Sequence, residues 1–74
     1  MNKIEFLEFK KLTVINTDKN SLKYLQKTIK GSKIYSGSSA FIGNEEFDID
    51  NIVQEGTNTY RLINSNSTLI VELE

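Results

Sequence analysis

The sequence predicts one α+β domain over residues 1–74, in which a small, mostly antiparallel sheet of four to five strands carries one α-helix on one face. Two observations predict this class. Apolar residues at helical spacing occupy residues 19–30, and apolar and polar residues alternate along much of the remaining chain. The expected order is β(β)-α-β-β-β-β, ending in a C-terminal meander. The length allows a single domain with a thin core.

The N-terminal part is predicted to form one long or two short strands. Residues 3–9 and 11–16 are rich in Ile, Phe, Leu and Val, and they fit helical spacing poorly. Lys10 and Lys11 separate the two stretches, which indicates a bulge or a bend there.

Residues 19–30 are predicted to form the helix. Three polar residues offer an N-cap: Asp18, Asn20 and Ser21. Three aliphatic residues at i, i+3 and i+7 form one apolar stripe: Leu22, Leu25 and Ile29. Gly31 stands where a helix C′ residue belongs, because glycine takes the left-handed conformation without penalty. Tyr24 lies off the stripe and is expected to be exposed.

The middle of the chain is predicted to form strands. Ile34-Tyr35 and Phe41-Ile42 flank residues 36–39, which predicts a short hairpin or a loop, with Phe41 in the core. A turn follows at Gly43-Asn44. The alternation then continues through residues 45–54 to a turn at Glu55-Gly56.

A helix over residues 45–54 is the alternative for this stretch, with Asn44 as its cap and Gly56 as its stop. The β-branched and Asn residues at positions 49 and 51–53 favour the strand.

The last hairpin is the best specified element. Residues 57–63 and 68–73 are joined by Asn64-Ser65-Asn66-Ser67, a composition typical of turns. Closing the loop symmetrically pairs Leu62 with Leu69 and Tyr60 with Val71. These four side chains then share the core face, which the helix is expected to cover.

Composition excludes most catalytic sites. The chain has no Cys and no His, so cysteine nucleophiles, Ser-His-Asp triads and the usual zinc sites cannot be assembled. Residues 48–51 match the first positions of a calcium-binding loop, but Ile52 and Val53 break the pattern. The sequence therefore predicts a protein that is not an enzyme and that binds no cofactor or metal.

Charge is divided between the two halves of the chain. Residues 1–33 carry eight Lys against three acids, which gives +5, and residues 34–74 carry one Arg against seven acids, which gives −6. We expect a small protein-interaction module, an adaptor, regulator or inhibitor, that docks through a charged surface. The predicted docking residues are acidic: Glu45, Glu46, Asp48 and Asp50.

A nucleic-acid-binding accessory protein is the alternative function. It depends on four lysines at i, i+4, i+8 and i+11 of the predicted helix, which would share one stripe: Lys19, Lys23, Lys27 and Lys30. Free sheet edges make a homodimer a candidate assembly. No stretch approaches the length of a membrane span, and no secretory segment is visible, so a cytoplasmic protein without membrane contact is expected.

Overall fold

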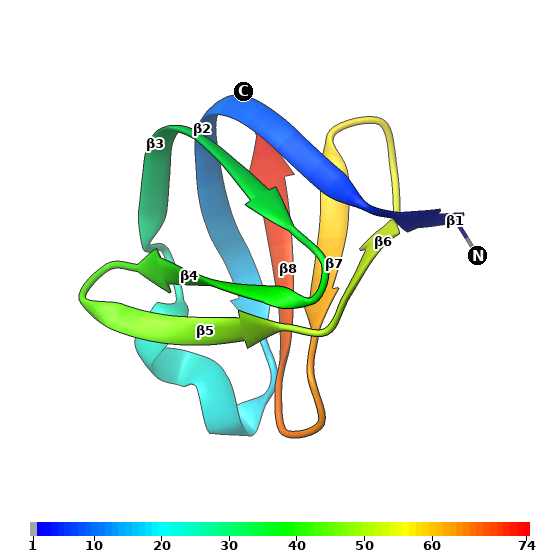
Figure 1. Ribbon diagram of the computed structural model, residues 1–74. Helices are drawn as coiled ribbons and strands as arrows, with labels where there is room; N and C mark the ends of the chain where they lie inside the picture. Colours follow the sequence, from blue (N-terminus) through cyan, green and yellow to red (C-terminus); the bar gives the residue numbers. More distant parts are fainter. Residues whose placement is uncertain (1) are drawn as a thin grey trace.

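The computed structural model describes residues 2–74, with side chains from Lys3 onwards, and this part of the chain is nearly all β (Figure 1). Eight strands and one 3₁₀ helix follow one another: β1 (Asn2–Ile4), β2 (Phe6–Thr17), η1 (Lys19–Tyr24), β3 (Thr28–Tyr35), β4 (Ser38–Ile42), β5 (Glu45–Ile49), β6 (Asn51–Gln54), β7 (Thr59–Ile63) and β8 (Thr68–Leu73). The predicted α+β class is therefore wrong, and the fold is mainly β.

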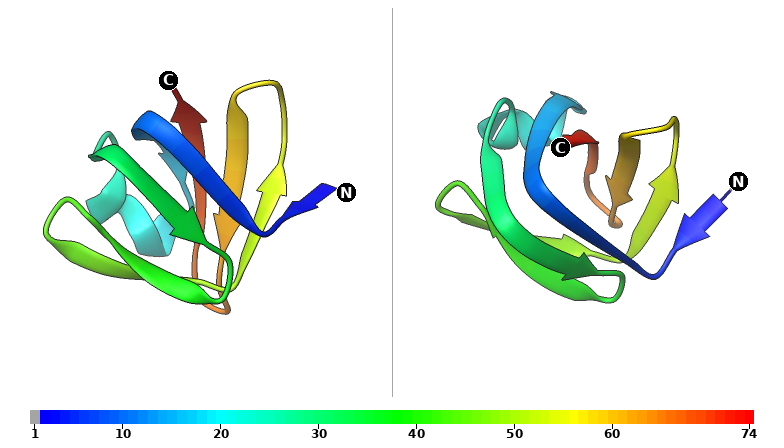
Figure 2. Two further views of the ribbon diagram at one scale, coloured as in Figure 1. Left: turned by 45° about the horizontal axis from the view of Figure 1, so that its top comes forward. Right: turned by 90° about the horizontal axis from the view of Figure 1, so that it is seen from above.

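The main sheet has six antiparallel strands in the order β1-β6-β7-β8-β2-β3. It curls into a half-barrel, and the separate β4–β5 hairpin lies across its concave side (Figure 2). Side chains of the hairpin enter the same core as those of the sheet: Ile42, Phe47 and Ile49 join Leu12, Val14, Leu62, Leu69 and Val71. The hairpin thus covers the sheet in the place that the sequence assigned to a helix.

The long strand β2 generates much of the curl. Its buried residues are Leu7 and Phe9 in the first half but Leu12 and Val14 in the second, so the alternation changes phase at Lys10-Lys11. This change confirms the irregularity predicted there. A register shift follows between Val14 and Asn16, where β2 pairs with β8. Such irregularities bend a strand and increase its twist.

No α-helix forms over residues 19–30. The 3₁₀ segment ends at Tyr24, and the backbone of Val14 then pairs with this stretch, because its N–H donates to Lys27 and its carbonyl accepts from Gln26. Leu22 and Leu25 are 63% and 37% exposed instead of buried. A short helix has little stability of its own, so the residues after Tyr24 pair with β2 instead of continuing as a helix.

Two other residues of the predicted helix take different roles. Ile29 packs against the core as a strand residue opposite Leu12, so its place in the helical spacing was coincidental. Gly31 has the positive φ (55°) expected for it, but it lies inside β3 and ends no helix. Tyr24, expected to be exposed, is buried at 4% exposure.

The predictions for the second half of the chain agree more closely with the structure. The last hairpin pairs Leu62 with Leu69 and Tyr60 with Val71 as predicted, although β7 begins at Thr59. Residues 45–54 form the strands β5 and β6, so the helical alternative is wrong. The turn at Gly43-Asn44 is confirmed, but β4 pairs with β5 and not with β3. Among the described residues, no helix is long and apolar enough to cross a membrane.

Candidate functional site

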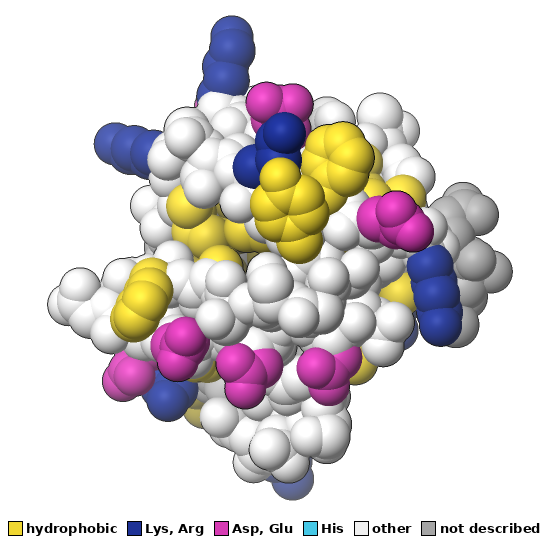
Figure 3. Space-filling model, viewed as in Figure 1, with side chains coloured by type: hydrophobic (Ala, Val, Ile, Leu, Met, Phe, Trp, Pro, Cys, Tyr) yellow, Lys and Arg dark blue, Asp and Glu magenta, His cyan; other side chains and the backbone are white. Residues whose placement is uncertain are grey.

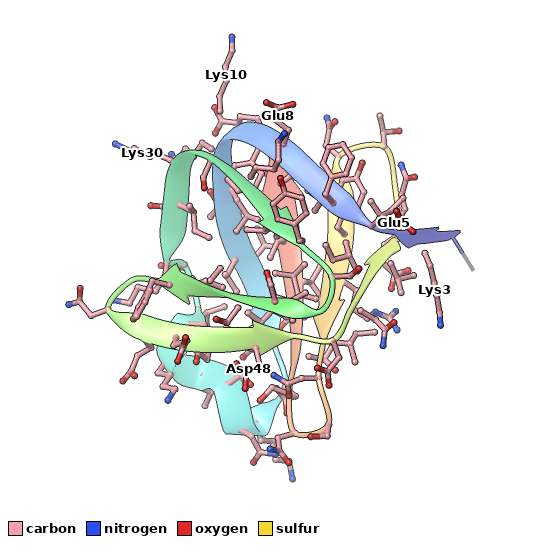
Figure 4. All side chains as sticks on the ribbon, in the orientation of Figure 1. Lys3, Glu5, Glu8, Lys10, Lys30 and Asp48 are labelled. Carbon is pink, nitrogen blue, oxygen red and sulfur yellow. The ribbon has the colours of Figure 1, made fainter. Side chains whose placement is uncertain are left out.

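The four predicted acidic residues lie together along β5 and the bend after it. Phe47 and Ile49 are buried, so Glu46, Asp48 and Asp50, which alternate with them, face outward. Glu45 pairs with buried Ile42 and lies on the other side of the strand, at its exposed first position. All four carboxylates are exposed: Glu45, Glu46, Asp48 and Asp50. They form a row over the hairpin in Figure 3, and Figure 4 shows Asp48 projecting from the outer side of β5.

An exposed aromatic ring stands beside this row. Phe41 in β4 lies directly opposite Glu46, and it is the most exposed large apolar side chain among the described residues, at 67%. On the same face Ser39 lies opposite Asp48, and its hydroxyl donates to Oε2 of Glu46 over 2.9 Å. Phe41, Ser39, Glu46, Asp48 and Asp50, with Glu45 at the edge, are called the acidic hairpin face below.

The sequence analysis placed Phe41 in the core, and that prediction was wrong. The turn at Gly43-Asn44 could have indicated which way Phe41 faces. Closing this turn symmetrically pairs Phe41 with Glu46 and Ala40 with Phe47, so Phe41 lies on the outward face that Glu46 occupies and not on the face of Phe47.

Contacts from elsewhere in the chain hold the acidic hairpin face in place. The Tyr24 hydroxyl donates to the Glu46 carbonyl oxygen over 2.7 Å, and its ring meets Phe47 edge-on with centroids 5.3 Å apart. Asn64 Nδ2 donates to the Asp48 carbonyl oxygen over 2.7 Å. Two backbone groups of β5 are thus tied to η1 and to the last hairpin. Glu46 and Asp48 therefore project from a fixed strand and not from a loop.

The acids also act on Tyr24 beneath them. Burial raises the pKa of the Tyr24 hydroxyl above its usual 10.0, and the charges of Glu45, Asp48 and Glu46 raise it further. The phenol thus stays neutral and able to donate its hydrogen bond across the physiological range.

We expect the free energy of unfolding to fall as the pH rises above about 10, in part through Tyr24. The unfolded chain loses the phenolic proton near that pH, whereas the folded protein still holds it. The folded state then binds more protons than the unfolded state, so stability decreases with pH. Urea titrations from about pH 9 to about pH 11 should show a shallower decline for Tyr24→Phe, which cannot ionise at this position. An equal decline of the free energy of unfolding in the two proteins would contradict the raised pKa of Tyr24.

The four lysines of the predicted stripe do not share one helical face. Lys19 and Lys23 lie in η1, Lys27 follows it, and Lys30 lies in β3. Lys23 Nζ is 3.8 Å from Oε2 of Glu45, with both side chains more than half exposed, so this pair contributes little to stability. The methylene groups of Lys27 pack over Gly43, where an added Cβ would lie 3.2 Å from Lys27 Cδ.

Within residues 2–74 the structure contains no detectable cavity and no cluster of three or more acidic side chains arranged to hold a metal ion. Comparison of the chain with protein-family models, curated proteins and solved structures found no match.

Proposed function

We propose that this protein is a non-enzymatic interaction module that docks a basic surface of another protein onto the acidic hairpin face. The observation that carries the proposal is the exposure of Phe41 beside a row of carboxylates, on a strand pair that the rest of the fold holds in place. An adaptor, a regulator or an inhibitor would work through such a surface.

The composition of the face suits this role. Binding energy in protein interfaces concentrates in a few large side chains near the centre, surrounded by polar groups that exclude water. Phe41 can supply the central contact, because burying its ring against a partner removes apolar surface from water. The acids along the neighbouring strand β5 steer a basic partner towards the face and suppress binding of acidic partners. Since the hairpin is fixed before binding, little ordering entropy is lost.

Binding measurements with variants of this face test the proposal. The wild-type protein would be immobilised to capture partners from nuclease-treated lysate of the native cell, and the affinity of a captured, purified protein would then be measured by interferometry. Phe41→Ala is expected to weaken binding about thirtyfold, the effect of losing a central interface residue. Changing the four acids to their amides should slow association and reduce its dependence on salt.

Phe6→Ala is the matched control, because Phe6 is a half-exposed aromatic residue on another strand pair and its loss should leave binding within about twofold. Unchanged affinity in both Phe41→Ala and the four-amide variant would contradict the assignment.

A further inference from the structure

A second surface combines aromatic rings with lysines, on the outer face of β2 and β3. Phe6 and Tyr35 lie directly opposite each other on these strands, at 48% and 49% exposure, with ring centroids 6.0 Å apart. Lys33 Nζ lies 5.2 Å from the centre of the Phe6 ring. Two apolar rings and an ammonium group therefore stand in solvent side by side.

Further along the same two strands, lysines gather around the middle of β2. Lys11 and Lys30 are direct cross-strand partners, an arrangement that destabilises a sheet through like-charge repulsion. Lys10 precedes Lys11, and Figure 4 shows Lys10 and Lys30 extending into solvent from the curved parts of β2 and β3. The fold tolerates this repulsion, and an anion bound between the lysines would relieve it.

Two acids lie near these lysines. Glu8 is opposite Lys33, and Glu74 lies 3.9 Å from Lys11 Nζ with its side chain 70% exposed. Four lysines against these two acids and Glu5, which is exposed next to Phe6, leave this surface positive, although the whole chain carries −1. Residues Phe6, Tyr35, Lys10, Lys11, Lys30 and Lys33 are called the aromatic-lysine face below.

We propose that the aromatic-lysine face binds single-stranded nucleic acid, with unpaired bases stacked on Phe6 and Tyr35 and phosphates held by the lysines. Exposed rings can stack only on bases that are free of a duplex, and positive charge beside them follows the backbone. About five residues separate the aromatic pair from the Lys11–Lys30 pair, which corresponds to roughly 17 Å along the strands. That distance accommodates several nucleotides in an extended strand.

The face is expected to tolerate different sequences. Arginine is the side chain that most often reads base edges, and the single arginine of the chain, Arg61, lies in β7, where it is hydrogen-bonded to Glu55. Stacking and phosphate contacts discriminate weakly among bases. This surface is separate from the acidic hairpin face, so either site can exist without the other.

Fluorescence anisotropy with labelled oligothymidine and oligouridine of twelve nucleotides tests the proposal in the 74-residue chain. We expect binding at low salt, with a slope of log K against log salt of about −3, because four lysines each contribute about 0.7 on a single strand. The triple variant Lys10→Gln/Lys30→Gln/Lys33→Gln should lose affinity at least about tenfold and show a slope near −1. Its matched control removes three lysines elsewhere, Lys19→Gln/Lys23→Gln/Lys27→Gln, and should stay within about twofold.

The aromatic pair requires its own variants. Phe6→Ala/Tyr35→Ala should lose about tenfold in affinity for the oligonucleotides while keeping the salt slope, whereas its affinity for heparin, which has no bases, should not change. Tyr35→Phe keeps a ring for stacking and should bind normally. Circular dichroism of each variant verifies that it is folded.

Three outcomes would overturn the inference. These are absence of binding at low salt, equal losses in the two triple-lysine variants, and equal losses of oligonucleotide and heparin binding in Phe6→Ala/Tyr35→Ala. None of these results bears on the acidic hairpin face, since Phe41 and its acids are intact in every variant.

Discussion

Replacing Leu12 with alanine is expected to lower the free energy of unfolding by about 2–5 kcal/mol. Leu12 has no exposed surface, and its strand lies between β3 and β8, where it pairs with Ile29 on one side and Leu73 on the other. The cavity left by the truncation is surrounded on both sides by strands that cannot collapse into it. A chain of this length is stable by only about 4–11 kcal/mol, so urea denaturation followed by circular dichroism would show the loss clearly.

Leu22→Ala is the matched control for this prediction. The same side chain is removed, but Leu22 is 63% exposed on η1, so we expect a change within about 0.5 kcal/mol. The pair of variants distinguishes the observed fold from the helical packing that the sequence suggested, in which Leu22 would lie in the core. If Leu22→Ala were as destabilising as Leu12→Ala, the description of residues 19–30 would be incorrect.

Tyr24→Ala is expected to destabilise the protein by about 3–5 kcal/mol, as is typical when a buried aromatic side chain is truncated. The variant loses both the edge-on contact with Phe47 and the hydrogen bond to the Glu46 carbonyl oxygen. Thermal and urea denaturation at neutral pH would measure the effect.

Tyr24→Phe separates the two contributions. It keeps the ring and removes only the hydroxyl, so we expect a loss of about 1 kcal/mol at neutral pH. If Tyr24→Ala were no worse than Tyr24→Phe, the ring would contribute nothing to the core. That result would contradict its burial.

Local signals explain which parts of the fold could be predicted. In the last hairpin the turn residues 64–67 fix the register, so the pairs Leu62–Leu69 and Tyr60–Val71 follow from the sequence alone. Residues 19–30 carry a helical pattern, but Thr28 and Ile29 pair with Thr13 and Leu12 of β2 instead. That competition involves residues far apart in the chain, and a local pattern cannot reveal it.

The two candidate surfaces also differ in whether local sequence or long-range strand pairing determines them. The outward direction of Glu46 and Asp48 follows from their alternation with Phe47 and Ile49. The aromatic-lysine face could not be predicted, because it requires the pairing of Phe6 with Tyr35 and of Lys11 with Lys30. Charge counting located lysines in the first half of the chain but could not show which of them meet.

The contacts that Tyr24 and Asn64 make with the carbonyl oxygens of Glu46 and Asp48 have a consequence for aggregation. These oxygens accept from side chains outside the β4–β5 pair, so a strand of another molecule adding to this side of β5 would have to displace both donors. Growth of an intermolecular cross-β fibril from this border is thereby disfavoured. The hydrogen bonds that orient the acidic row thus also help to keep the molecule from polymerising through it.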